Sequence, residues 1–244
     1  PVSDTVIRYG LGAKGTGEKA INAIITARTE GGAFTSLFDF CNRVERNCLN
    51  KRTVEALIKA GAFDSLELNR AALLASIELA FEYASTQAAN ANQGGLFDML
   101  DDGHGSSTQE PELVQTTPWS LKERLVQEKT AVGFFLSGHL FDEHAKEIRA
   151  FIRTPLADLI DSREPQLIAG IVSDLRFING NRGKLALFRL DDNSEALEAN
   201  AEESVFARSS LLKEDALIIA QARLQADRFS GGMRLQIQQI WDMP

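Results

Sequence analysis

Apolar residues recur at helical spacing through residues 1–90, in segments that glycines separate. Ile21, Ile24 and Ile25 predict a helix that follows a turn at Gly15-Thr16-Gly17 and ends at Gly31-Gly32. A short helix is expected over residues 36–44. The other expected helices are one from Lys51, capped by Asn50, and a long one from Asn69 through Phe81. A second glycine turn, Lys59 to Asp64, separates these two.

The pattern changes in the second half of the chain. A helix is expected after Pro118-Trp119, running into Leu136, and another over Phe141 to Phe151. From Gln166 the apolar period shortens towards two, which is typical of strands. The expected strands and helix are 167–175, 185–190, 197–203, a helix over 204–212, 216–224 and 233–241. The strand at 197–203 reads Leu-Glu-Ala-Asn-Ala-Glu-Glu, so its low strand propensity predicts a frayed or misregistered edge.

The order strand, strand, strand, helix, strand, strand is that of a small Greek-key barrel of the oligonucleotide-binding kind (OB-fold). The tandem helix–glycine turn–helix units resemble the paired helix-hairpin-helix module of DNA-binding proteins. We therefore predict a multidomain α+β protein with an all-α module before a small β-barrel. The expected divisions are 1–84 for the hairpin module, 85–117 for a flexible linker, 118–164 for a helical connector and 165–244 for the barrel.

The glycine turns are candidate contacts for duplex DNA. Glycines before a helix let backbone N–H groups approach an anion, and a helix N-terminus favours negative charge. The candidate phosphate-binding residues are Lys14, Gly15, Gly17, Lys19, Lys51, Arg52 and Gly61. The alternative is an ordinary tight turn beside a solvated basic face, and the turn alone does not decide between the two.

The barrel offers a second set of candidates, at its predicted turns. Phe177 precedes the hairpin 179–184, which contains Arg182 and Lys184, and Arg228 and Phe229 lie at the turn 227–232. The basic residues would contact the phosphates of single-stranded DNA, and the two phenylalanines would stack on bases. The alternative is that both phenylalanines belong to the core.

Gln93-Gly94-Gly95-Leu96-Phe97 lies in a polar run, residues 85–105, for which we expect no stable fold. Apolar residues in such a run suggest a short peptide that docks into a groove of another protein. Gln93, Leu96 and Phe97 resemble the peptide through which bacterial replication proteins bind the sliding clamp. The alternative is a contact of Leu96 and Phe97 with the chain's own core.

Charge and cysteine content limit the remaining functions. The net charge is −8 and most of the acidic surplus lies in residues 91–165, so any nucleic-acid contact has to come from local basic loops. Cys41 and Cys48 have no histidine nearby and match no metal motif, which favours reduced thiols in a cytoplasmic protein. No signal peptide or membrane-spanning run is recognised, and we expect no membrane contact.

Four polar residues invite a catalytic or metal-binding interpretation. His139 and His144 have no third ligand nearby in the sequence, so we expect a cap or surface role. Asp191 and Asp192 stand in a predicted turn, where acids commonly form the turn itself.

Specific stretches resemble the C-terminal part of the alpha subunit of bacterial replicative DNA polymerase III. They are Ile7 to Ala13, Leu49-Asn50-Lys51-Arg52, Leu57 to Asp64, Asn69 to Leu73, Gly133 to His139, Ala169 to Val172 and Asp227 to Gly232. The resemblance implies a hairpin module, an internal clamp-binding peptide and an OB barrel.

The resemblance further implies that the chain is part of a DNA-directed DNA polymerase. It places the catalytic acids, and the Mg²⁺ that they hold, upstream of Pro1, so no catalytic residue, cofactor or metal is expected in this segment. The implied partners are duplex and single-stranded DNA, the sliding clamp and other replisome subunits.

Two other functions stay open from the sequence. The first is a fragment of a DNA ligase or repair nuclease, although the ligase pattern Lys-x-Asp-Gly is absent because Leu100 precedes Asp101-Asp102-Gly103. The second is a non-catalytic scaffold that binds DNA and the clamp.

Overall fold

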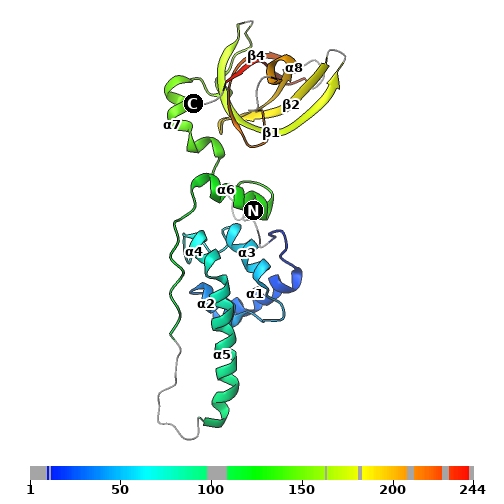
Figure 1. Cartoon of the computed structure of the whole chain (residues 1–244). Coiled ribbons are helices and arrows are strands. Elements are labelled where there is room, and N and C mark those ends of the chain that lie inside the picture. Colours follow the sequence, from blue (N-terminus) through cyan, green and yellow to red (C-terminus); the bar gives the residue numbers. More distant parts are fainter. Residues whose placement is uncertain are drawn as a thin grey trace. The chain divides into compact units, whose positions relative to one another are not determined.

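The computed structural model describes residues 10, 12–97, 109–162, 164–180, 183–207, 212–226 and 231–241. The chain forms two compact units, Pro1–Ser137 and Gly138–Pro244 (Figure 1). The first unit is helical and the second is a β-barrel with short helices before it. The predicted connector 118–164 is therefore divided between the two units.

Six helices form the described part of the helical unit. They are α1 (Glu18–Gly31), α2 (Leu37–Arg43), α3 (Lys51–Lys59), α4 (Arg70–Ala75), α5 (Ile77–Phe97) and α6 (Leu121–Val132). The caps predicted at Asn50 and Asn69 are confirmed, since each side chain accepts a hydrogen bond from a backbone N–H of the first turn. Ser36 caps α2 in the same way.

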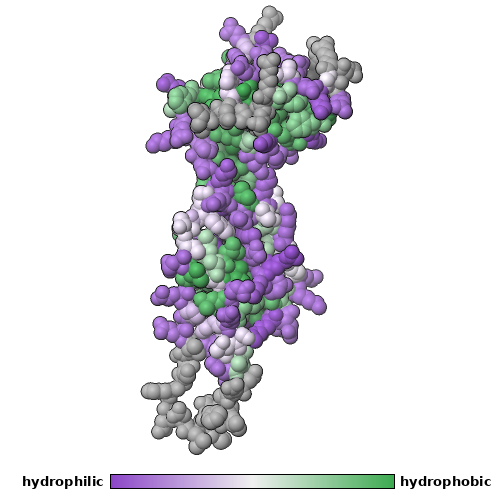
Figure 2. All heavy atoms as spheres, in the orientation of Figure 1, coloured by the Kyte–Doolittle hydropathy of each residue, from purple (hydrophilic) through white to green (hydrophobic). Residues whose placement is uncertain are grey.

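The core of this unit is built around aromatic side chains. Phe40 makes edge-to-face contacts with Phe34 and Phe63, with ring centroids 5.0 and 4.9 Å apart. Leu57 and Ile58 of α3 belong to the same core and are almost fully buried. In the view of Figure 2, hydrophilic residues cover most of the visible face of this unit, with hydrophobic patches between them.

The long helix predicted from Asn69 is broken at Ser76, which separates α4 from α5. Ser76 is fully buried; its hydroxyl donates to the Ala72 carbonyl (2.7 Å) and accepts from the Val114 backbone N–H (2.8 Å). A serine that bonds back to the preceding turn bends a helix. The break therefore serves a contact with a distant segment, which local spacing cannot reveal.

The predicted flexible linker 85–117 differs from the structure at both ends. Helix α5 continues to Phe97, in keeping with the high helix propensity of the alanines in this stretch. Residues 109–117, which we call the return segment, run back along the unit (Figure 1). Besides the Ser76 contact, Glu110 accepts from the Ser36 hydroxyl, and the Thr116 carbonyl accepts from the Asn69 side chain.

Helix α6 ends earlier than predicted. Ser120 and Glu123 form a capping box at its start, and Gly133, with φ 100°, ends it in the left-handed conformation. In place of the helix predicted over 141–151, the chain forms a 3-10 turn, η1 (Leu140–Glu143), and then α7 (Ala145–Phe151). A second 3-10 turn, η2 (Leu156–Asp158), precedes the barrel.

The described part of the barrel has five strands. They are β1 (Gln166–Gly180), β2 (Gly183–Asp191), β3 (Ala196–Glu202), β4 (Leu217–Ala226) and β5 (Met233–Trp241), with α8 (Glu203–Phe206) between β3 and β4. The sheet closes in the order β1-β2-β3-β5-β4, with β3 and β5 parallel and the other pairs antiparallel. This is the Greek-key order of the OB-fold, so the predicted fold class is confirmed.

The third strand is neither frayed nor misregistered, and that prediction was wrong. Strand β3 pairs with β2 over residues 196–202 and with β5 over residues 198–201. Ala199 and Ala201 point into the barrel and are buried, while the acidic side chains alternate outward. The segment forms a strand because its residues alternate with a period of two and its inward residues are small enough to fit the barrel. Pairing with the neighbouring strands outweighs the low strand propensity of the sequence.

Within the described residues, no helix is both long and apolar enough to cross a bilayer.

Candidate nucleic-acid interface

The first glycine turn lies against two helices of the same unit. The Lys14 N–H donates to the Ala131 carbonyl (2.7 Å), and the Thr16 N–H donates to the Ala13 carbonyl (3.0 Å). The small side chains of Ala13, Ala56 and Ala131 form a buried cluster here. Because these side chains are small, the turn, α3 and the end of α6 approach one another closely.

The turn presents unpaired backbone donors. Gly15 has φ 93°, a conformation that favours glycine, and Gly17 is the N-cap of α1 without a side-chain cap. The first N–H bonded within α1 is that of Ile21, which donates to the Gly17 carbonyl. The N–H groups of residues 17–20 thus have no acceptor in the described part of the chain, and they lie at the positive end of a helix dipole.

Basic side chains lie beside the same glycine turn. Lys14, Arg52 and Lys59 line an open groove of about 440 Å³, together with Glu55, Gly15 and Thr130. Lys59 pairs with Glu55 (2.7 Å), whereas Lys14 and Arg52 are exposed and have no acidic partner among the described residues. The groove can therefore attract an anion with two free cationic side chains.

The structure separates Lys19 and Lys51 from this groove. Lys19 is exposed on the first turn of α1 and lines a different hollow, with Glu45 and Cys48. Lys51 forms an ion pair with Glu78 of α5, so its charge is already balanced. The sequence brought these residues together with Lys14 and Arg52, and the structure does not.

The second glycine turn contains a buried arginine. Gly61 has φ 79°, and a Cβ at this position would collide with the guanidinium group of Arg70. Arg70 bonds the Lys59 carbonyl (3.2 Å), Asp64 (2.7 Å) and Glu128 of α6 (2.8 Å). Position 61 therefore needs a residue without a Cβ, because the guanidinium group of Arg70 fills the turn.

Sequence reasoning missed both Arg70 and Glu128. The available signal was the spacing in α6, where Glu128 shares an apolar face with Leu125 and Val132. Glu128 is fully buried, and its carboxylate also accepts from the backbone N–H groups of Leu136 and Ser137 (2.9 and 3.0 Å). Burial raises the pKa of Glu128, but these N–H groups and Arg70 outweigh burial, so the pKa lies below its ordinary value.

The barrel candidates are described only in part. Phe177, at the far end of β1, is 54% exposed and contacts the ring of Phe206 in α8, with centroids 5.3 Å apart. Lys184 is exposed at the start of β2, and its backbone N–H donates to Glu203 (2.9 Å). Arg182, Arg228 and Phe229 lie outside the described residues.

The clamp-peptide candidates lie at the end of α5. The backbone of residues 93–97 forms the last turns of this helix. The side chains of Gln93, Leu96 and Phe97 lie outside the described part of the structure.

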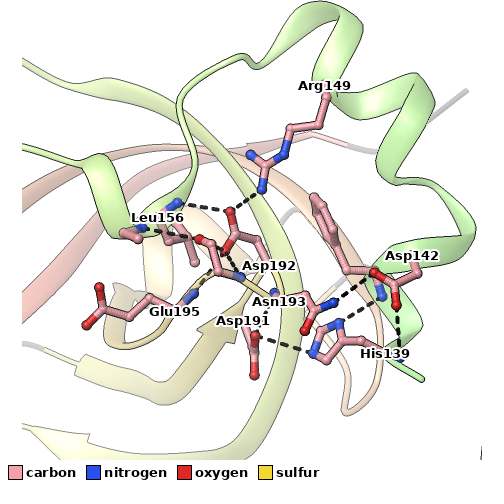
Figure 3. A network of polar contacts seen from close by, with 11 residues as sticks. His139, Asp142, Arg149, Leu156, Asp191, Asp192, Asn193 and Glu195 are labelled. Atoms are coloured by element: carbon pink, nitrogen blue, oxygen red, sulfur yellow. Dashed lines mark hydrogen bonds and ion pairs between the residues drawn. The ribbon is translucent and has the colours of Figure 1, made fainter. Parts of the chain in front are cut away.

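Three of the four candidates, His139, Asp191 and Asp192, belong to a structural network in the barrel unit (Figure 3). His139 caps η1 by accepting from the Phe141 N–H (3.1 Å), and its Nε2 lies 3.3 Å from Asp191. The hydrogen bond to Asp191 raises the pKa of His139 above its ordinary value, and partial burial opposes this. The predicted cap role is confirmed for His139.

Asp192 forms the turn that follows β2. It accepts from the side chain and backbone N–H of Ser194, from the Leu156 N–H (2.9 Å) and from Arg149 of α7 (2.5 Å) (Figure 3). The prediction that the acids act as turn formers is confirmed for Asp192. Within the described residues, no group of three or more His, Cys, Asp or Glu side chains is placed to hold a metal ion.

The chain is similar to known proteins over nearly its whole length. A family model described as a helix-hairpin-helix motif matches residues 2–73. The DNA polymerase III subunit alpha of Neisseria meningitidis serogroup B is 44% identical over 97% of this chain. Those of Pseudomonas aeruginosa and Escherichia coli are 39% and 35% identical, each over 98% of this chain. The resemblance predicted from the sequence is confirmed.

The chain spans about one fifth of the length of these curated relatives, between 20% and 22%. Among solved structures, a replication protein A heterotrimer bound to ssDNA aligns at 21% identity with a TM-score of 0.30, covering 37% of this chain and 24% of that one. RecG bound to a three-way DNA junction aligns at 13% identity with a TM-score of 0.29, covering 86% of this chain and 32% of that one. The OB-fold assignment rests on the strand order of the closed barrel.

Proposed function

We propose that this chain is the DNA- and clamp-binding part of a replicative DNA polymerase. In this proposal it grips duplex DNA, tethers the enzyme to the sliding clamp and contacts single-stranded template. The chemistry of nucleotidyl transfer, with its Mg²⁺ ions, would belong to parts of the polymerase that this chain does not cover. The same proposal implies that the chain binds other replisome subunits and is located in the cytoplasm. The similarity to polymerase subunits favours it over a ligase or nuclease fragment.

One observation carries the duplex-binding part of the proposal. The unpaired N–H groups at the start of α1 lie at the glycine turn whose Lys14 and Gly15 line one groove with Arg52. Backbone donors and flexible basic side chains at one place suit a phosphate group and carry no base specificity. Arg70 fills the second turn, so we assign the phosphate contact to the first turn and give Gly61 a supporting role.

A charge-reversal experiment on the whole chain tests this assignment. Lys14→Glu with Arg52→Glu should weaken binding to a labelled duplex about tenfold or more and reduce the dependence of log Kd on log salt by about two. Lys122→Glu, at another exposed lysine, at the start of α6, is the control and should change little. Lys51→Glu should weaken duplex binding less than the double change in the groove, because Glu78 already balances the charge of this lysine. Equal effects at Lys122 and in the groove would disprove the assignment.

The clamp-binding part rests on the motif Gln93–Phe97 and on its place between the hairpin helices and the barrel. Truncating a docked Leu-Phe pair should cost about 2 kcal/mol or more of binding free energy. Leu96→Ala with Phe97→Ala should therefore abolish clamp binding in calorimetry and leave thermal stability nearly unchanged. Gln93→Ala should weaken binding less. Thr86→Ala, an exposed position on the same helix, is the control. A fall of many degrees in Tm for the double change would instead assign both side chains to the core.

The barrel is proposed to bind single-stranded DNA through its turns. Lys184, with Arg182 and Arg228, would contact phosphates, and Phe177 and Phe229 would stack on bases, each worth about 1–3 kcal/mol. Phe177 retains an exposed face although it contacts Phe206. Phe177→Ala with Lys184→Ala should weaken binding of an oligothymidylate while circular dichroism stays unchanged. Loss of the barrel's folded signal would assign Phe177 to the core.

A further inference from the structure

A small apolar pocket of about 260 Å³ opens on the helical unit, between α1, α2, α3 and the second glycine turn. Its floor is made of four buried apolar side chains: Ile24, Phe40, Leu57 and Phe63. Its rim carries three small, exposed residues: Ala33, Ala62 and Ser65. Because the rim residues are small, they leave the entrance open. We call this feature the hairpin pocket.

Phe34 forms one wall of the hairpin pocket and is held from two sides. Its ring makes an edge-to-face contact with Phe40, and the Arg43 guanidinium group lies 4.6 Å from its centroid. Arg43 is itself fixed, because it donates to the carbonyls of Ala27 and Gly32 (2.8 and 2.9 Å). The wall is therefore preformed, and an occupant does not have to order it.

A single charge lies at the hairpin pocket. Among the described residues, Arg28 of α1 is the only charged side chain in the lining, and it is exposed without an acidic partner. Four acids are close in the sequence, and none of them lines the pocket: Glu30, Asp39, Asp64 and Glu67. Asp39 and Asp64 pair with other arginines. The hairpin pocket thus suits an apolar group that carries a carboxylate beside it.

The size of the hairpin pocket limits what can occupy it. Its volume of about 260 Å³ is below the range of about 300–1,000 Å³ typical of pockets that hold a whole small ligand, so it suits one large side chain. A contact built on one side chain is much smaller than the roughly 1,000 Å² of a stable interface between separate proteins. A segment of the same polypeptide can still occupy it, because the tether raises its effective concentration. This chain spans about one fifth of its polymerase relatives, so most of such a polymerase lies outside it.

We propose that the hairpin pocket binds a large apolar side chain with an acidic neighbour, supplied by a part of the same polymerase that this chain does not cover. The apolar side chain packs on Phe40 and Phe63, and the acidic neighbour pairs with Arg28. The contact fastens the helical unit to the rest of the polymerase. The hairpin pocket shares no lining residue with the groove at Lys14 and Arg52, so the proposal does not depend on DNA binding.

An NMR titration of the whole chain tests the chemistry of the hairpin pocket. The probes are an acetylated hexapeptide with one phenylalanine between glutamates, and the same peptide with lysines in place of the glutamates. The net charge of −8 favours the lysine peptide, so a preference for the glutamate peptide has to come from the pocket. The glutamate peptide should bind with a millimolar Kd or tighter and shift the amide signals of Ala33 and Ala62.

Two variants locate this binding. Arg28→Ala should raise the Kd of the glutamate peptide about threefold or more, and the control Arg46→Ala, at another exposed arginine, should change it little. Ala62→Leu places a larger side chain at the rim and should raise the Kd about tenfold or more. Its control, Ala75→Leu, adds the same group at an exposed alanine of α4 and should change little. Duplex binding should be the same in all four variants.

Cross-linking in the complete polymerase identifies the occupant. A p-benzoylphenylalanine in place of Ile25, which is exposed on α1 between Ile24 and Arg28, should cross-link to an acidic segment of the same polypeptide. The same group in place of Ala89, exposed on α5, should not reach that segment. Cross-links from position 25 to another subunit alone, or to nothing, overturn the assignment to the polymerase itself.

The titration has equally definite outcomes. The proposal is overturned if neither peptide binds, if the lysine peptide binds as tightly as the glutamate peptide, or if Ala62→Leu leaves binding unchanged. If Arg28→Ala weakens duplex binding and leaves peptide binding unchanged, Arg28 belongs to the DNA interface and the proposal fails. Nuclear Overhauser contacts from residues 1–9 or 98–108 to Ala62 would make this chain its own occupant and also overturn it. Circular dichroism of each variant separates these results from unfolding.

Discussion

Glu128 of α6 and Arg70 of α4 form a buried ion pair, with a nitrogen–oxygen distance of 2.8 Å and side chains 0% and 4% exposed. Arg70 also donates a hydrogen bond to the carbonyl at the end of α3. Glu128 also accepts hydrogen bonds from the backbone N–H groups of Leu136 and Ser137. One pair of side chains therefore joins the second glycine turn to α6, although the two are far apart in the sequence. Helix α6 is part of the hairpin module for this reason.

Removing one partner of this pair should be costly. Glu128→Ala leaves a buried guanidinium without its partner, so we expect a loss of about 3–5 kcal/mol in the free energy of unfolding of the helical unit. Glu123→Ala, which removes an acid of the capping box on the same helix, should cost about 1 kcal/mol. Urea unfolding followed through Trp119, in a Trp241→Phe background, reports on the helical unit. Equal losses for the two variants would show that the pair adds nothing beyond a cap.

Local patterns predicted the parts of this fold that depend on neighbours in the sequence. The caps at Asn50 and Asn69 and the alternation along β2 needed only a few adjacent residues. The errors arose where a distant partner decides the structure. The helix breaks at Ser76, whose hydroxyl accepts a hydrogen bond from the Val114 N–H. Strand β3 is regular because β2 and β5 pair with it on both sides.

The candidate site also combines neighbours in the sequence with distant partners. The sequence indicated Lys14, Gly15, Gly17 and Arg52, because glycines and basic residues near a helix start are visible in one dimension. The ion pair of Lys51, another candidate DNA contact, with Glu78, 27 residues away, is not visible in the sequence.

The return segment is predicted to depend on Ser76. Ser76→Ala removes the acceptor of the Val114 N–H and leaves that group unpaired, which should destabilise the helical unit by about 1–3 kcal/mol. It should also speed proteolysis within residues 109–117, since fewer contacts would hold them. Thr86→Ala removes a similar hydroxyl, which among the described residues bonds the Glu82 carbonyl of its own helix, and should leave both readouts unchanged. A protease-resistant Ser76→Ala variant would contradict the role of this hydrogen bond.

The two glycine turns should respond differently to alanine. Gly61→Ala places a Cβ against Arg70 at a positive φ, so it should lower the stability of the helical unit by more than about 1 kcal/mol. Gly17 has φ −80°, and a methyl group at its Cα would meet no atom within 4 Å, so Gly17→Ala should leave the Tm nearly unchanged. In the proposed function that methyl group would obstruct a phosphate, and duplex binding should weaken. If instead Gly17→Ala lowers the Tm and Gly61→Ala weakens duplex binding, the roles of the two turns are exchanged.

Asp192 should make the barrel unit sensitive to acid. Burial raises the pKa of Asp192, but hydrogen bonds from Ser194, Arg149 and the Leu156 N–H outweigh burial, so the pKa in the folded state lies below its ordinary value. A lowered folded pKa gives stability that is present above the unfolded pKa, about 3.9, and is lost as the pH falls through the folded value. Asp192→Asn should therefore destabilise the barrel strongly near neutral pH and progressively less as the pH falls below about 4. Asp158→Asn, at an exposed acid of η2, should cost little at either pH. Urea unfolding followed through Trp241, in a Trp119→Phe background, measures the barrel alone. A loss of stability for Asp192→Asn that does not change with pH would show that Asp192 acts through shape and hydrogen bonding alone, without a contribution from its charge.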